Sequence, residues 1–390
     1  MSITLFNATV LTPSESKKGH AIVVSGEGRI EYVGPTESAP WHEGRHIDVA
    51  GRMVAPGFID IHRHGGVGVA FGAGASISED LDRVSEWIPI EGITGFLCSI
   101  AAPDRDSLLK IVREYAAALD AGTSGADAIG LHLEGPYLDR DRKRGVFNPD
   151  WLRDPSLEEA AALLDAGRGW IRQVTMDPSL PGAHEVASSF RKSGVVVAMG
   201  HTDAGYEAAS TALRGDFTHV THTYNCLGEF HHRDPGCIGA VLASDDATTE
   251  LIADTVHVHP GAMRILVRCV GVDRIVLISD AVIGSGVEDG EYEMLGHTIV
   301  VKDGETRLRD GTIAGSTAPF NRCVDDINKL VGVPLPEAVQ MATLNPARVM
   351  GLDDRIGSVS VGRDADLIVI NDDVDVLLTM VKGRIALDDL

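Results

Sequence analysis

The stretch FIDIHRHG (residues 58–65) joins a short apolar run to two histidines one residue apart. Seven further short runs rich in Val, Ile and Leu follow it, and most are separated by stretches with a helical pattern. Alternating strands and helices indicate a parallel sheet with helical crossovers. The eight predicted strands cover residues 58–65, 92–100, 128–136, 171–178, 195–203, 219–225, 249–258 and 274–281.

The number of these units indicates a closed barrel. Eight strand–helix units in residues 57–345 match the count and size of an α/β TIM-like (β/α)8 barrel. A doubly wound open sheet is the competing topology, but its Gly-rich phosphate turn is missing. Among the helices, SLEEAAALLDAG (residues 156–167) begins with Ser156 and Glu159, the pattern of a capping box.

The two chain ends resemble each other and differ from the middle. Residues 1–56 and 346–390 hold short Val- and Ile-rich runs separated by Gly and Asp, which are strand and turn signals. Each end alone is too small to bury a good core. We therefore expect both ends to meet in one small β-sandwich domain that flanks the barrel domain of residues 57–345.

Composition narrows the class of protein. The 390 residues include 34 basic and 57 acidic side chains, a formal net charge of −23. This charge argues against a nucleic-acid partner and against an acidic membrane surface. Five scattered cysteines without a CxxC pair indicate reduced thiols. Since no signal-peptide pattern and no apolar run of about 18 residues is found, we expect a cytoplasmic location.

Polar residues recur where the predicted barrel strands end. In barrel enzymes the C-terminal ends of the strands form the active-site face. Side chains from these ends converge on one axis, where imidazoles and carboxylates together are best satisfied by a divalent metal ion. The residues concerned are His62, His64, Glu134, His201, His222, His257 and Asp280.

Individual residues suggest distinct roles. His62 and His64 are two positions apart on a strand and therefore point to the same face. Glu134 has a carboxylate that could bridge two ions. Asp280 is placed to take a proton from water and pass it to a leaving group, although a helix N-cap is an alternative role. A divalent ion lowers the pKa of bound water from 15.7 to about 7, so the predicted chemistry is metal-assisted hydrolysis of an amide or ester.

Several segments carry a resemblance to a known family. The most specific are GLHLEGPYL around Glu134 and EFHHRDPGCIGAVL around Arg233, and HRH, GHT and the Asp of SDA are shared more widely. With APGFIDIHRHGG, THTYN, LIADTVHVHP, DGTIAGS and MATLNPARVMGL they extend over nearly the whole chain. The chain resembles the amidohydrolase superfamily, and within it the N-acetylglucosamine-6-phosphate deacetylase family.

The resemblance implies roles for particular residues. Glu134, His201 and His222 are similar to the principal metal ligands of that family, and His62 and His64 to the pair that holds a second ion in two-metal members. Asp280 matches the acid/base. The remaining residues that match the family lie where its members bind the sugar and its phosphate. They are Asn225, Cys226, Arg233, His257 and the backbone of Ile313, Ala314 and Gly315.

The resemblance also implies a cofactor and partners. One or two divalent ions are expected, zinc first, with iron or manganese as alternatives. Relatives with a carbamylated lysine on the fourth strand are not matched, because IRQVTMDP (residues 171–178) has no lysine. The expected substrate is an amino-sugar phosphate, and the expected assembly is a homodimer in which Arg233 can reach the neighbouring active site. A surface ion pair with Asp234 is the alternative for Arg233.

Besides Cys226, which replaces a usual Ala, three positions depart from the family pattern. Phe147 stands where many relatives carry a polar residue, often His, that helps to polarise the acyl carbonyl. Thr255 replaces a common Gly, and Pro319 lies in a stretch that usually contains Leu and Met. The alternatives are therefore an isomeric or unphosphorylated N-acetylhexosamine, another cyclic amide, or, as the least expected, a non-catalytic barrel used for binding.

Overall fold

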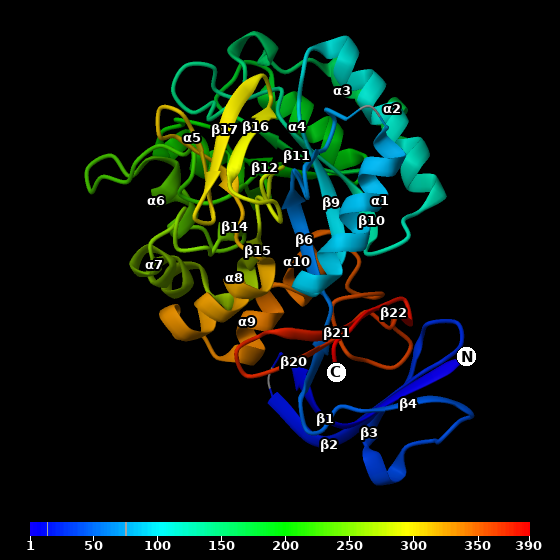
Figure 1. The fold of residues 1–390 in the computed structure, drawn as a ribbon. Helices are drawn as coiled ribbons and strands as arrows, with labels where there is room; N and C mark the ends of the chain where they lie inside the picture. The colour runs from blue at the N-terminus through cyan, green and yellow to red at the C-terminus, as the bar shows by residue number, and fades with distance from the viewer. Residues whose placement is uncertain (14, 75) are drawn as a thin grey trace.

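A computed structural model describes residues 1–13, 15–74 and 76–390. Figure 1 shows a helix-covered barrel, a smaller sheet domain that contains both chain termini, and a four-stranded sheet beside the barrel. Within the described ranges, none of the helices has the length and apolar character needed to cross a bilayer. The α/β barrel with a separate sheet domain, as predicted, is confirmed.

Eight parallel strands form the barrel sheet in the order β15-β14-β13-β12-β11-β10-β9-β6. The two edge strands meet where they end, because Asp280 N–H donates to His62 O at 2.9 Å and His64 N–H donates to Ala281 O at 2.7 Å. All eight predicted strands are present. Their bounds are β6 (Phe58–Arg63), β9 (Ile93–Ala101), β10 (Asp127–Glu134), β11 (Ile171–Met176), β12 (Val196–Met199), β13 (His219–Val220), β14 (Thr248–Ile252) and β15 (Ile275–Ile278).

Buried charges hold this junction between β6 and β15. Asp60 accepts hydrogen bonds from the Ser279 hydroxyl at 2.5 Å and the Ser279 N–H at 3.1 Å. Arg63 is fully buried and pairs with Asp60 at 3.0 Å and with Glu91 at 2.6 Å. Removing one member of such a network leaves a buried charge without a partner, which costs about 3–5 kcal/mol. The network therefore fixes the start of the segment that carries Asp280.

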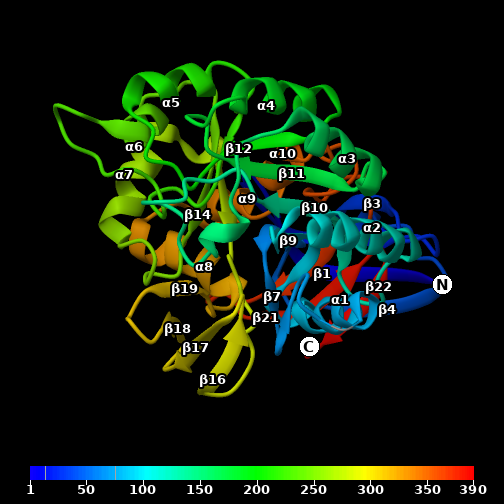
Figure 2. The same cartoon turned by 90° about the horizontal axis from the view of Figure 1, so that it is seen from above.

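Helices surround the strands when the barrel is seen from above (Figure 2). The predicted helix at 156–167 is α3, and the Ser156 hydroxyl accepts from Glu159 N–H. The Glu159 carboxylate does not complete the capping box, because it binds Arg153 at 2.6 Å instead. The helices are α1 (Ile77–Trp87), α2 (Arg105–Ala121), α3 (Leu157–Gly167), α4 (Ala183–Lys192), α5 (Tyr206–Leu213), α6 (Gly236–Leu242), α7 (Pro260–Val270), α8 (Phe320–Asp326), α9 (Leu335–Met341) and α10 (Leu344–Val349).

One part of the barrel interior is an apolar cluster, and α10 contributes to it. Ala347, Met350 and Ile356 pack with inward-facing residues of the barrel strands, including Ile59 and Ile278. The predicted division at 345/346 therefore falls inside a helix that belongs to the barrel core. We propose that the barrel domain continues to about residue 356 and that only the strands after it belong to the small domain.

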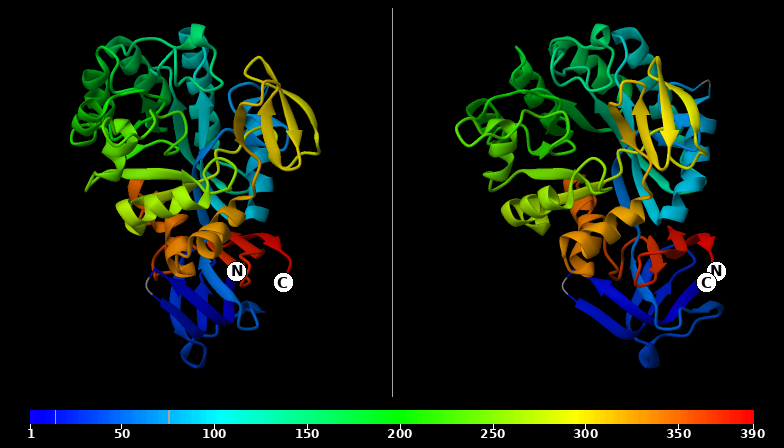
Figure 3. Two further views of the ribbon diagram at one scale, coloured as in Figure 1. Left: turned by 90° about the vertical axis from the view of Figure 1, so that its left-hand side faces the viewer. Right: turned by 60° about the vertical axis from the view of Figure 1, so that its left-hand side comes forward.

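The small domain is built from both ends of the sequence, and Figure 3 shows the N-terminal strands (blue) and the C-terminal strands (red) on the same side of the barrel. Its strands are hydrogen-bonded into a single sheet, in which β5 joins the N-terminal strands to β20. Alternate residues such as Leu5, Val54 and Leu367 face one shared core. The strands are β1 (Ser2–Thr12), β2 (Glu15–Val24), β3 (Ile30–Pro35), β4 (Gly44–Asp48), β5 (Met53–Pro56), β20 (Leu367–Ile370), β21 (Val376–Val381) and β22 (Arg384–Asp388).

An antiparallel sheet lies between β15 and α8, and the sequence analysis did not predict it. Its strands alternate exposed and half-buried residues, as in GEYEM, and tight turns join them. The last strand returns to the barrel, where Ser316 N–H donates to Asp280 O at 2.9 Å. The strands are β16 (Gly290–Met294), β17 (His297–Lys302), β18 (Glu305–Leu308) and β19 (Ile313–Ser316), and a short hairpin after β6 adds β7 (Gly65–Gly66) and β8 (Val69–Ala70).

Asp366, just before β20, provides a test of stability. Burial raises the pKa of its carboxyl to about 7, although the carboxylate accepts a hydrogen bond from Lys382 N–H at 2.7 Å. The unfolded-state pKa is about 3.9, so this group stabilises the folded chain below about pH 4 and loses that contribution as the pH rises towards 7. Asp366→Asn cannot ionise, and we expect it to be more stable than the wild type at pH 8.

The gain at pH 8 is a few kcal/mol at most, since each unit of pKa shift corresponds to about 1.4 kcal/mol. It should disappear near pH 4, where both side chains are neutral. Thermal unfolding of both proteins at several pH values measures the difference. An unchanged difference between pH 4 and pH 8 would contradict this assignment.

Candidate active site

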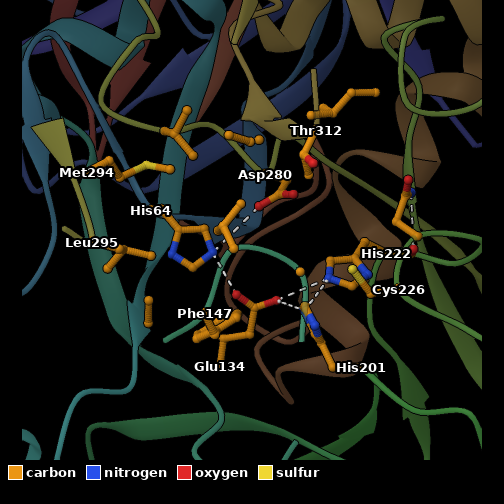
Figure 4. A pocket seen from close by; sticks show the side chains of 18 of the residues that line it. His64, Glu134, Phe147, His201, His222, Cys226, Asp280, Met294, Leu295 and Thr312 are labelled. Atoms are coloured by element: carbon orange, nitrogen blue, oxygen red, sulfur yellow. Dashed lines mark hydrogen bonds and ion pairs between the residues drawn. The ribbon is translucent and has the colours of Figure 1, made fainter. Parts of the chain in front are cut away.

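The predicted site residues gather at the mouth of the barrel, where a cavity of about 290 Å³ opens (Figure 4). Every predicted site residue lines this cavity except two. His62 is fully buried behind it, and Arg233 lies on an exposed loop before α6. The predicted residues that line the cavity are His64, Glu134, His201, His222, Asn225, Cys226, His257, Asp280, Ile313, Ala314 and Gly315.

Glu134, His201 and His222 form the tightest group. Glu134 Oε1 lies 3.0 Å from His201 Nε2 and 3.1 Å from His222 Nε2, and the two nitrogens are 3.0 Å apart. Three donors at this spacing can all lie about 2.0–2.2 Å from one cation, the bond length that zinc makes to nitrogen and oxygen ligands. All three side chains are almost fully buried.

The partners of the imidazoles show which ring nitrogen is free. His201 Nδ1 faces the Lys143 carbonyl at 2.7 Å, and His64 Nδ1 faces the Ser99 carbonyl at 3.0 Å. A carbonyl oxygen only accepts, so each Nδ1 carries a proton and donates. In the neutral ring, Nε2 then has a free lone pair directed into the cavity. This is the arrangement in which histidine binds metal ions.

A second group joins the first through Glu134. His62 Nε2 and His64 Nε2 are 3.2 Å apart, and each lies 3.6 Å from Asp280 Oδ1. Glu134 Oε2 lies 3.0 Å from His64 Nε2, while Oε1 faces the other group. Burial alone would raise the pKa of Glu134, but His62 and His201 lower it well below its usual value. Either group of donors would therefore suit a divalent ion beside an ionised carboxylate.

The backbone places these side chains at positions of local strain. His201, His222 and Asp280 each follow a barrel strand and have φ angles of 48°, 27° and 51°. Residues other than glycine seldom adopt positive φ, and such strain concentrates at functional sites. Gly315 has a φ of 86°, and a Cβ there would lie 3.0 Å from Asp280 O. The strand β19 can therefore approach Asp280 only with glycine at this position.

Glu250 was missed by the sequence analysis. It lies on β14, is fully buried, and accepts from His62 Nδ1 at 2.9 Å and from His222 N–H at 3.0 Å through Oε2. Oε1 accepts from Gln173 Nε2 at 2.8 Å and faces His219 Nε2 at 3.2 Å. The available signal was a charged residue within the apolar run TELIADTVHV. Glu250 orients one member of each candidate metal group.

Polar groups occupy one side of the cavity. His257 donates from Nδ1 to Asp254 at 2.7 Å, and Asp254 also accepts from the Ser316 hydroxyl at 2.8 Å. Burial lowers the pKa of His257, but the hydrogen bond to Asp254 and the negative charges of Asp254 and Asp280 together outweigh it, and the net shift of the pKa is upward. Asn225 and Cys226 line the same cavity. This side can receive an anionic or hydroxylated group.

The three departures from the family pattern lie in different surroundings. Phe147 is buried in the cavity wall, and its ring centroid is 5.3 Å from that of His201. Thr255 is exposed with a φ of 64°, a conformation that explains why glycine is common there. Pro319 precedes α8 and does not line the cavity. Of the three, only Phe147 can contact a ligand in the cavity.

Known proteins share this architecture and sequence pattern. The amidohydrolase family profile matches residues 53–386. The chain is 33% identical to the N-acetylglucosamine-6-phosphate deacetylase of Bacillus subtilis (strain 168), over 99% of this chain and 97% of that protein. It is 32% identical to an N-acetylgalactosamine-6-phosphate deacetylase of Escherichia coli O157:H7, over 86% and 88%.

A solved structure agrees over the full length. It is a mutant N-acetyl-D-glucosamine-6-phosphate deacetylase from Mycobacterium smegmatis, in complex with N-acetyl-D-glucosamine-6-phosphate. The TM-score is 0.90 at 32% identity, covering 99% of each chain. The chain belongs to the N-acetylglucosamine-6-phosphate deacetylase family of amidohydrolases. The family resemblance predicted from the sequence is confirmed, and this amidohydrolase carries the candidate metal groups described above.

Glu250 provides a test of the second candidate metal group in this amidohydrolase. Glu250→Gln keeps an oxygen that can accept from His62 and His222 but removes the negative charge that makes the His62 ring a stronger ligand. We expect the cation affinity of the His62 and His64 group to fall about 10- to 100-fold, the usual effect of losing such a partner. The Glu134, His201 and His222 group should keep its ion.

Metal content after dialysis against chelator-buffered zinc, followed by mass spectrometry of the native protein, measures both occupancies. Glu207→Gln is the matched control, because Glu207 is an exposed carboxylate on α5. Identical metal content and affinity in the two variants would show that Glu250 does not support a metal ligand.

Proposed function

We propose that this chain hydrolyses the N-acetyl group of N-acetyl-D-glucosamine 6-phosphate, with acetate and the amino-sugar phosphate as products. The observation that carries the proposal is the convergence of Glu134, His201 and His222 beside Asp280 at the floor of one cavity. The full-length similarity to relatives that bear this activity in their names supports it.

The donor set suits a divalent ion held by Glu134, His201 and His222, with a second at His62 and His64. Zinc is the expected metal, and iron and manganese are the alternatives. When bound, such an ion polarises the amide carbonyl and lowers the pKa of water, so that water is a competent nucleophile near neutral pH. The other steps depend on side chains of the chain itself.

Asp280 is the proposed acid/base. Its N–H donates to His62 O, and its carbonyl accepts from Ser316 N–H, so its backbone is held from both sides. The carboxylate reaches the cavity and can accept the proton of the attacking water. It can then protonate the amine as the carbon–nitrogen bond breaks. Phe147 offers no hydrogen-bond donor, so stabilisation of the developing oxyanion must come from elsewhere in the site.

The 6-phosphate of the proposed substrate needs a positively charged partner. Lysine and arginine are absent from the described residues that line the cavity, and only His257 can supply a cation beside Asn225 and Cys226. Arg233 lies outside the cavity, with Nη1 2.9 Å from His232 Nε2. We propose a homodimer in which the partner subunit's Arg233 completes the phosphate site.

An apolar surface next to this loop fits such a dimer. Phe230 and Ile265 are 55% and 53% exposed and line one shallow groove with residues of α5, α6 and α7. Exposed apolar patches of this kind often mark protein interfaces.

The cytoplasmic location remains a prediction from the sequence.

A second candidate substrate is N-acetylgalactosamine 6-phosphate. It is favoured by the 32% identity to a relative named for that reaction. The two sugars differ only in the configuration at C4 and carry the same charge, so electrostatic attraction cannot distinguish them. A panel of both phosphorylated sugars and their unphosphorylated forms distinguishes the candidates.

Asp280→Asn tests the reaction and the role of Asp280 together. The amide cannot transfer a proton, so kcat should fall about 10²- to 10⁴-fold for the best substrate of the panel. Metal content should stay unchanged. Release of the free amino sugar and metal analysis are measured on the same samples. A variant that loses metal along with activity would indicate that Asp280 is a ligand.

Arg233→Ala tests the phosphate site. We expect kcat/KM to fall at least about 100-fold for the phosphorylated sugar, because a buried charged hydrogen bond to phosphate contributes about 1.5–3 kcal/mol and its loss leaves phosphate charge unpaired. The unphosphorylated sugar should be affected little. Arg214→Ala, an exposed arginine after α5, is the control. Equal losses for both substrates would rule out phosphate binding by Arg233.

A further inference from the structure

We propose that the cavity accepts N-acyl groups longer than acetyl, and that N-propionyl and N-butyryl amino-sugar phosphates are hydrolysed at least as well as the N-acetyl form. This inference rests on the proposed function and extends it to a substrate class. It follows from the walls on the two sides of the candidate metal groups. Water would supply its hydroxyl to the acyl carbon and a proton to the amine, releasing a short fatty carboxylate and the amino sugar.

The two sides of the site differ in chemistry. Figure 4 shows Cys226 and His222 on one side of Glu134, and Met294 and Leu295 beside His64 on the other. The amide carbon has two substituents besides its oxygen, namely the sugar nitrogen and the acyl chain. If the sugar phosphate lies on the polar side with Cys226, the acyl chain must point to the other side.

That other side is apolar. Phe147 and Met294 are buried, with 4% and 6% of their surface exposed. Leu295 and Val146 pack against the cluster that contains Met294, and all four residues line the cavity. The Phe147 ring lies directly against His201, so the apolar wall begins at the candidate ligands themselves. A single methyl group cannot contact all of these side chains at once, whereas a chain of three or four carbons can.

A second cavity adjoins the first at this wall. It has a volume of about 550 Å³ and lies between the loop before η3 (Pro149–Trp151) and the inserted sheet. Gly145, Val146, Phe147, Leu295 and Thr312 line both cavities. Trp151 also lines the second cavity, as do the polar side chains of Arg144, His297 and Asp310. The two cavities therefore adjoin at the wall formed by Phe147 and Leu295.

The decisive experiment compares N-acetyl-, N-propionyl-, N-butyryl- and N-hexanoyl-glucosamine 6-phosphate with the metal-loaded full chain. Burial of one methylene corresponds to about a fourfold gain in affinity. We expect kcat/KM to stay level or to rise up to about fourfold per methylene from acetyl to butyryl. A fall of tenfold or more from acetyl to propionyl, in a protein that hydrolyses the acetyl form, would overturn the inference and leave the proposed function intact.

Absence of turnover with every member of the series would overturn the proposed function and this inference with it. A binding measurement separates the effect of acyl-chain length on affinity from its effect on the reaction rate. Calorimetry with Asp280→Asn should give dissociation constants that decrease, or remain equal, as the acyl chain grows. Dissociation constants that increase tenfold per methylene would contradict the inference whatever the rates.

The variant Leu295→Asn tests whether the acyl chain contacts the wall at Leu295. Leu295 has a φ of 53°, which asparagine tolerates, so the turn at β16 should be kept. We expect the butyryl-to-acetyl ratio of kcat/KM to fall about tenfold or more, because a polar side chain replaces the apolar contact. Val361→Asn, at a residue 62% exposed on a loop before β20, is the control. An unchanged ratio in Leu295→Asn would show that the acyl chain does not pass this wall.

Discussion

Three electron-rich atoms meet within 3.1 Å of one another at the centre of the barrel mouth. They belong to Glu134, His201 and His222, which come from three different strands. Lone pairs brought this close repel one another unless a proton or a cation lies between them. Because the surroundings are nearly dry, this repulsion is weakly screened, and the affinity for a positive ion is correspondingly high. The rest of the site is arranged around this constraint.

The constraint explains an otherwise costly set of buried polar groups. Glu250 is fully buried, yet it receives four donors, two of which come from His62 and His222. A buried carboxylate is stable only when its oxygens are satisfied in this way. Asp60 has a similar role at the strand junction, where it ties Ser279 to the first barrel strand. Barrel closure and the orientation of the site therefore both depend on buried carboxylates whose oxygens are satisfied by hydrogen bonds.

The barrel and the central residues could be predicted from the sequence because both follow strict rules. Strands of a parallel barrel are apolar, so a polar residue at the strand end, such as Glu134 or His201, stands out against its neighbours. Glu250 breaks the same rule in the middle of its strand, and its role became clear only when His62 was found beside it. Periodicity alone cannot show which distant imidazole a buried carboxylate meets.

Other features could not be predicted for different physical reasons. The inserted sheet has half-exposed strands, whose pattern resembles a loop rich in charged residues. The Glu159 carboxylate does not complete the capping box, because it forms an ion pair with Arg153 instead. That contact depends on the folded loop that carries Arg153. Arg233 was singled out by its sequence, but its distance from the cavity follows from the course of the chain in space.

The sheet formed by β16 to β19 has a consequence for how this protein can evolve. It enters after Ala281 and rejoins the barrel at Ser316, so it is attached at neighbouring points of the rim. Its own small cluster, which includes Met294 and Ile299, is separate from the barrel core. Changes in β16 to β18 can alter selectivity without loosening the contacts of β19 that hold Asp280. New specificities could therefore arise here by exchange of one module, while the chemistry is inherited unchanged.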